Sequence, residues 1–101
     1  MFSFGQSDIE LKKSLSKYNI EWKDNMKLSS VGKYIMLDNN QSIIRLDRIP
    51  ETCADYGTLS HEIFHSVDTI FRFIGMNLTE DSDESYAYMI GYLTTQIYTR
   101  F

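Results

Sequence analysis

The stretch TLSHEIFHSVDTIFRFI, residues 58–74, decides how this chain folds. Apolar residues recur in it at spacings of three and four, the period of one face of an α-helix. These residues are Leu59, Ile63, Val67, Ile70 and Ile74. A polar line follows a neighbouring face and consists of His61, His65, Asp68 and Arg72. The stretch predicts a helix over about residues 58–74, capped by Gly75, with the histidines beside its buried face.

The two histidines of this helix, the only ones in the chain, carry the chemistry of the pattern. His61 and His65 are four residues apart, so they share a face and can offer two imidazoles to one point. Glu62 lies one step round the helix, within reach of a water bound at that point. This H-E-x-x-H pattern predicts a zinc site with the glutamate as general base. The alternative is an amphipathic helix that carries two histidines by chance.

Size and composition narrow the class of protein. A chain of 101 residues is one domain, and 43% hydrophobic residues are typical of a folded one. The net charge of −4 gives no electrostatic footprint for nucleic acid. The N-terminus lacks the features of a signal peptide, and no apolar run reaches membrane-spanning length. Cys53 is the single cysteine, which favours a reducing compartment, so we expect a soluble cytoplasmic protein that does not bind membranes.

The N-terminal part of the chain predicts a helix and a short strand. Ser7 and Glu10 have the spacing of a capping box, so a helix is expected over about residues 8–17. Ile20 and Trp22 then alternate with polar residues, which indicates a short strand.

Residues 33–37 and 42–48 have the pattern of a β-hairpin. Asn39 and Asn40 stand between the arms, and asparagine tolerates the positive φ of a tight turn. The second arm alternates apolar and charged residues, namely Ile44, Arg45, Leu46 and Asp47. This alternation predicts one face in solvent. A strand of such a hairpin would pair with an extended peptide.

A second long helix is predicted from about residue 83 to the end. Its core-facing residues would be Met89, Ile90, Leu93 and Ile97. Catalytic zinc usually has three protein ligands, and with no third histidine the best candidate is Glu84, at the start of this helix. A short turn between antiparallel helices would bring it back over the histidine face. Asp81 and Asp83 are alternatives, and Glu84 also fits a capping box begun by Asp81.

The combination of H-E-x-x-H, eighteen intervening residues (66–83) and Glu84 resembles the gluzincin zinc metallopeptidases. The resemblance implies that His61, His65 and Glu84 bind one Zn²⁺ per chain and that Glu62 activates water to cleave a peptide or protein substrate. Residues 59–93 also resemble small zincin-like proteins of tailed bacteriophages. That likeness implies a setting in the host cytoplasm or the virion, and leaves room for a homo-oligomer or a larger assembly.

Two further side chains have candidate roles near the metal. Asp68 would accept the second N–H of a zinc-bound histidine, or would instead pair with Arg72 one turn later. Tyr88, one turn after Glu84, is the favoured donor to the oxyanion. Tyr86 and Tyr98 are expected to pack.

Together these patterns predict an α+β, minimal zincin-like domain. It has an N-terminal helix, a small antiparallel sheet or hairpin, and two C-terminal helices that carry the metal site. The expected function is zinc-dependent hydrolysis of a peptide bond. Larger members of the family add a second domain that walls the cleft, whereas this sequence ends seventeen residues after Glu84. The alternative is therefore a non-catalytic interaction or assembly module with a structural or vestigial zinc site.

Overall fold

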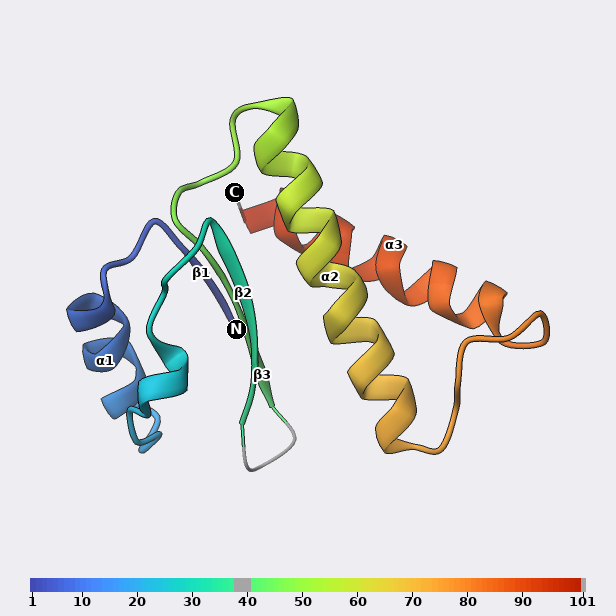
Figure 1. Ribbon diagram of the computed structural model, residues 1–101, viewed down its shortest axis with the longest axis horizontal. Coiled ribbons are helices and arrows are strands. Elements are labelled where there is room, and N and C mark those ends of the chain that lie inside the picture. The colour runs from blue at the N-terminus through green and yellow to red at the C-terminus, as the bar shows by residue number, and fades with distance from the viewer. Residues whose placement is uncertain (38–40, 101) are drawn as a thin grey trace.

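The computed structural model describes residues 1–37 and 41–100, and it confirms the α+β class (Figure 1). A small sheet lies in the middle, with α1 on one side and α2 and α3 on the other. The elements are β1 (Phe2–Phe4), α1 (Asp8–Ser16), the 3₁₀ turn η1 (Asp24–Met26), β2 (Gly32–Met36), β3 (Ser42–Leu46), α2 (Cys53–Phe73) and α3 (Asp83–Arg100). The predicted turn at Asn39 and Asn40 lies outside the described residues.

The sheet has the strand order β1–β3–β2. β2 and β3 are antiparallel, with Gly32 opposite Leu46 and Met36 opposite Ser42, which confirms the hairpin. β1 pairs with the other edge of β3 in parallel, with Phe2 beside Ile44. The sheet is therefore mixed, whereas an antiparallel one was expected, because three residues are too few to show a strand period in the sequence.

Arg45 corrects the prediction that one face of the second hairpin arm is in solvent. β3 is the central strand, and Arg45 is completely buried on the side that faces α1. Its guanidinium donates to Asp8 Oδ1 at 2.7 Å and to the carbonyl oxygens of Met26 at 2.7 Å and Gln6 at 2.9 Å. The charge in the strand pattern thus belongs to a buried guanidinium, paired with a carboxylate that is 35% exposed, and its hydrogen bonds tie α1 and η1 to the sheet.

The N-terminal helix forms as predicted, but the strand after it does not. The Ser7 side chain accepts from the Glu10 backbone N–H and the Glu10 carboxylate accepts from the Ser7 N–H, each at 3.1 Å. After Asn19, which has a φ of 58°, the chain has no regular structure until η1. Ile20 and Trp22 instead cover the apolar cluster between α1 and the sheet. This cluster consists of Leu11, Leu15, Met26, Ile35, Leu37 and Ile43.

The histidine-bearing helix α2 is longer at its N-terminus than predicted. Thr52 and Asp55 form a capping box that starts the helix at Cys53, five residues before the predicted start at about residue 58. The helix ends at Phe73, and Gly75 follows with a φ of 82°, as expected for a terminating glycine. Leu59, Ile63 and Val67 are buried in the main core, whereas Ile70 and Ile74, predicted to share that stripe, are 37% and 64% exposed.

α3 runs antiparallel to α2 and packs against it through tyrosines near both ends. The rings of Tyr86 and Phe71 are 4.8 Å apart, and those of Tyr98 and Tyr56 are 5.8 Å apart, between centroids. Ile97 is buried, and Met89, Ile90 and Leu93 pack against the core at its rim. Within the described residues, none of the helices combines the length and apolar character that a bilayer-crossing segment needs.

Candidate metal centre

The structure brings His61 and His65 together on the solvent side of α2. Their Nε2 atoms are 3.0 Å apart and the two rings meet edge to face. Two ligands at about 2.0–2.1 Å from a tetrahedral zinc would be separated by roughly 3.3 Å. The pair therefore fits two positions of a zinc site, and the same contact also suits a neutral pair in which one Nε2–H donates to the other. Both histidines are exposed, so an ion and its remaining ligands have free access.

Glu62 lies beside this pair but points toward the sheet. Its side chain is only 9% exposed, and Oε1 is 3.9 Å from His61 Nε2. The helix places it one step round from the histidines, on the side where α2 faces β2. A glutamate at this position is held next to the point where the imidazoles converge without competing for it, as a general base requires.

Gly32 allows β2 to approach α2 closely at this point. A Cβ at residue 32 would lie 2.6 Å from Thr58 Cγ2, 3.1 Å from Leu46 Cδ2 and 3.4 Å from Glu62 Cγ. Any side chain here would therefore press on Thr58 and reach the stem of Glu62. The start of β2 is thus a wall of the candidate centre, a role that the sequence pattern did not reveal because Gly32 stands just before the predicted strand.

Glu84 is not brought to the histidine pair. Among the described residues, no three His, Cys, Asp or Glu side chains are grouped so that they could hold a metal ion. Glu84 is exposed in the first turn of α3, two residues before Tyr86, which contacts Phe71. Since the helices are antiparallel, that turn lies opposite the end of α2, roughly two turns or about 12 Å beyond His65. Its assignment as a ligand stays a prediction.

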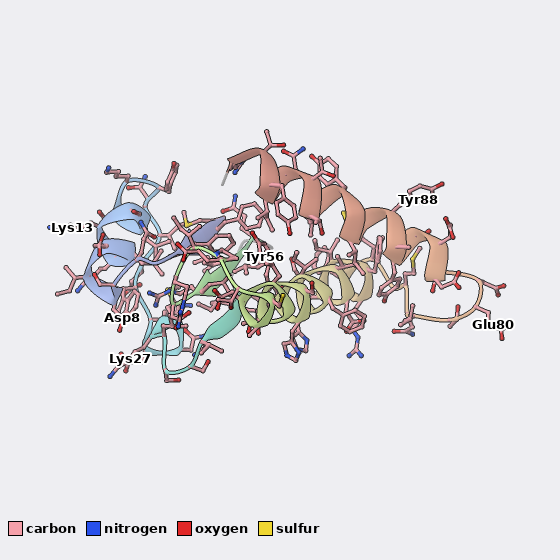
Figure 2. All side chains as sticks on the ribbon, turned by 90° about the horizontal axis from the view of Figure 1, so that it is seen from above. Asp8, Lys13, Lys27, Tyr56, Glu80 and Tyr88 are labelled. Atoms are coloured by element: carbon pink, nitrogen blue, oxygen red, sulfur yellow. The ribbon has the colours of Figure 1, made fainter. Side chains whose placement is uncertain are left out.

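The alternative carboxylates Asp81 and Asp83 flank the same turn and are also exposed. Asp81 lies in the link between α2 and α3 and Asp83 is the first residue of α3. Glu80 marks this link in Figure 2, at the end of the molecule opposite α1. Ser82 organises this link, because its hydroxyl accepts from the Thr79 backbone N–H at 2.9 Å and donates to the Asn77 carbonyl. The link is therefore shaped by local hydrogen bonds, and it stays at the far end of α2.

Asp68 makes the ion pair expected from the sequence and one further contact. Its Oδ2 is 3.0 Å from Arg72 Nε, one turn later on α2, and its Oδ1 accepts from the Tyr86 hydroxyl at 3.1 Å. Burial, and then the bond to this carboxylate, raise the pKa of the Tyr86 phenol. Asp68 thus connects α2 to α3, and its role in orienting a histidine stays a prediction.

Tyr88 lies on the outer face of α3. Its side chain is 74% exposed and points away from α2 (Figure 2). It borders a shallow hollow together with Ser85, Met89 and Tyr92. In this arrangement its hydroxyl does not face the histidines, and its assignment as oxyanion donor stays a prediction.

No protein-family model matches this chain, and no curated protein or solved structure matches it significantly.

Proposed function

We propose that this chain is a minimal zinc-dependent metallopeptidase of the gluzincin type, with His61 and His65 as ligands of one Zn²⁺ per chain. One observation carries the proposal. Two imidazole nitrogens converge at 3.0 Å, and a largely buried carboxylate lies 3.9 Å from one of them. A purely structural zinc site would need the two histidines as ligands, but it would not need the Glu62 carboxylate beside them. Glu84 remains the candidate for the third ligand.

Glu62 does the proton transfer in this proposal. Zinc, when bound, polarises the scissile carbonyl and lowers the pKa of a water molecule to about 7. Glu62 takes a proton on Oε1 as the water oxygen attacks the carbonyl carbon, and it returns that proton to the amine nitrogen as the C–N bond breaks. Its low exposure and its distance of 3.9 Å from His61 Nε2 support this role, because they keep the carboxylate beside the histidine pair.

The second candidate function is a non-catalytic interaction or assembly module. One observation favours it, namely the 67% exposure of the His61 side chain. In either case we propose a peptide or protein partner and no nucleic acid or membrane. We also propose a cytoplasmic setting, which is the host cytoplasm or the virion if the chain is phage-encoded.

Metal analysis of protein purified without a histidine tag tests the site. We expect one zinc per chain in the wild type, and loss of the metal with a lower melting temperature in His65→Ala, because metal binding adds to folding free energy. Ser60→Ala, an exposed position on the same helix, is the matched control and should retain zinc. Full zinc occupancy in a His61→Ala, His65→Ala double variant would place the metal elsewhere.

A peptide-library cleavage assay of zinc-loaded protein tests the reaction. Glu62→Gln keeps the size of the side chain and removes the base, so it should fold and bind zinc like the wild type. Cleavage should fall by a factor on the order of a hundred or more. Glu80→Gln, an exposed acid in the α2–α3 link, should cleave normally. A wild type that never turns over diverse peptides favours the module, and equal cleavage by Glu62→Gln rejects the mechanism.

A further inference from the structure

The histidine pair occupies the side of α2 that faces solvent. The sheet covers the side of α2 that carries Ile63, and α3 packs against α2 through Tyr56 and Phe71. His61 and His65 lie on the remaining side of the helix, where both are exposed, the His61 side chain by 67%. A metal ion held by the two Nε2 atoms would therefore direct its other coordination positions away from α2, toward solvent.

The geometry of the pair suits half of a closed zinc site. Zinc in such a site is four-coordinate and tetrahedral. The two Nε2 atoms, 3.0 Å apart, fit two adjacent positions of that tetrahedron. The other two positions form an equivalent pair, related to the first by a twofold axis through the metal. A second copy of the chain, rotated about this axis, would fill them with its own two histidines, and twofold symmetry is the commonest symmetry of homo-oligomers.

The charged side chains near the pair do not oppose such a contact. Asp68 and Arg72, which follow His65 by one and two turns, neutralise each other at 3.0 Å. Glu62 is largely buried beside the pair, with Oε1 3.9 Å from His61 Nε2. Two copies thus bring two carboxylates, whose charge equals and opposes that of one Zn²⁺. Burial of an ion in a contact is far less costly when opposite charges lie next to it.

We propose that two copies of the chain share one zinc ion through His61 and His65 of each copy, and that this dimer is a closed, inactive form of the site. A closed tetrahedral site has no position left for water, whereas a catalytic site keeps one open. The inference rests on the histidine pair of the proposed function and concerns its regulation. Scarce zinc and abundant protein favour the dimer, and excess zinc gives each chain its own ion and separates the copies by mass action.

A zinc titration of the full chain, purified without a histidine tag and stripped with chelator, tests the dimer by sedimentation velocity. A concentration of about 0.1 mM chain populates a dimer of micromolar Kd. We expect the mass to rise from 11.8 kDa to twice that value and to peak at one zinc per two chains. In excess zinc the mass should fall back as bound zinc reaches one per chain.

Two results of the titration would overturn the proposal. One is a mass that stays monomeric at every zinc ratio, and the other is a mass that rises without limit, as in unspecific aggregation by zinc. Mg²⁺, which prefers oxygen ligands, is the control ion and should leave the mass unchanged.

Four variants locate the contact. His61→Ala and His65→Ala should each stay monomeric, because one imidazole per chain fills only half of the tetrahedron. Gly57→Arg tests the surface rather than the ligands. Gly57 lies one turn before His61, and a Cβ there would meet nothing within 4 Å, so α2 tolerates the side chain while its bulk and charge obstruct a second copy.

The dimer of Gly57→Arg should be weaker by about tenfold, because like charges face each other across the contact. Gly91→Arg, at the equally open glycine of α3, is the matched control and should dimerise like the wild type. Dimerisation by either histidine variant, or equal dimerisation by the two arginine variants, overturns the proposal.

The two proposals fail separately. A zinc-dependent dimer that turns over no peptide in excess zinc supports the shared site and rejects the hydrolase. Turnover by a zinc-bound chain that is monomeric at every zinc ratio supports the hydrolase and rejects the dimer. If both proposals hold, turnover per bound zinc is low up to one zinc per two chains and rises as further zinc is added.

Discussion

Replacement of Gly32 by alanine tests the close contact between β2 and α2 that shapes the candidate centre. The new Cβ would lie 2.6 Å from Thr58 Cγ2, against about 3.5–4.0 Å for normal carbon contacts, so Thr58 must shift by about 1 Å. Thr58 resists because its χ1 is stiff and its hydroxyl donates to the Ala54 carbonyl at 3.2 Å.

The size of the effect follows from two opposing terms. Overpacking of this kind costs about 1–3 kcal/mol, and the smaller conformational freedom of alanine in the unfolded chain returns about 0.4–1 kcal/mol. The expected net loss of unfolding free energy is about 1–2 kcal/mol. For a domain of this size that loss lowers the melting temperature by roughly 5–15 °C.

A double-mutant cycle with Thr58→Ser provides the assay, with urea unfolding followed by circular dichroism. Serine removes Cγ2, the atom that clashes, and keeps the hydroxyl bond to Ala54. Most of the loss caused by Gly32→Ala should disappear in this background, which corresponds to a coupling of about 1 kcal/mol. If Gly32→Ala costs the same with serine as with threonine at residue 58, the steric reasoning is refuted.

Three other outcomes are expected. Arg45→Ala should lower the free energy of unfolding by about 1–3 kcal/mol or more, because it empties a buried site and leaves the buried Met26 carbonyl without its donor. Arg45→Met, which fills the site, should cost clearly less in the same urea experiment. The Arg45 hydrogen bond lowers the pKa of Asp8, and the Ser7 backbone N–H lowers that of Glu10. Stability from these carboxylates is therefore complete above about pH 5, beyond their unfolded-state pKa values, and is lost as the pH falls through their lower folded-state values. Urea midpoints with chelator present should show this decline, and Asp8→Asn should reduce it; a midpoint that stays flat to pH 2 contradicts the assignment. In a competitive chelator titration, Glu84→Gln should weaken zinc binding more than the same change of charge in Asp83→Asn, and the reverse order would exclude Glu84.

Short-range sequence patterns, namely helix caps and apolar residues at helical spacing, predicted most of the helices. The Ser7–Glu10 capping box and the Leu59–Ile63–Val67 stripe each depend on neighbours within a few residues, and both are present in the structure. The convergence of the histidines follows from the helix period alone. Features whose cause lies within one or two turns of the chain are therefore readable from a single sequence.

Features set by distant partners could not be read in this way. Apolar and charged residues alternate around Arg45. The same alternation occurs when the charged residue faces solvent and when it pairs with a distant residue, as Arg45 does with Asp8, 37 positions away. The number of residues between His65 and Glu84 does not give their distance in space, because the packing of α3 on α2 sets that distance. The exposed Ile70 and Ile74 fit the helix stripe, and only the position of β2 shows that they border a pocket.

The central position of β3 has a consequence for the order in which the molecule assembles. Few residues separate β2 from β3, with Met36 opposite Ser42, whereas about forty separate β1 from β3, with Phe2 beside Ile44. Closing the longer loop costs about 1.7 kcal/mol more in chain entropy. The hairpin can therefore form first, and the N-terminal strand docks onto it last. Gly32, Glu62 and the two histidines all belong to the continuous segment between residues 32 and 65, so this part of the candidate centre can be shaped before the N-terminus arrives.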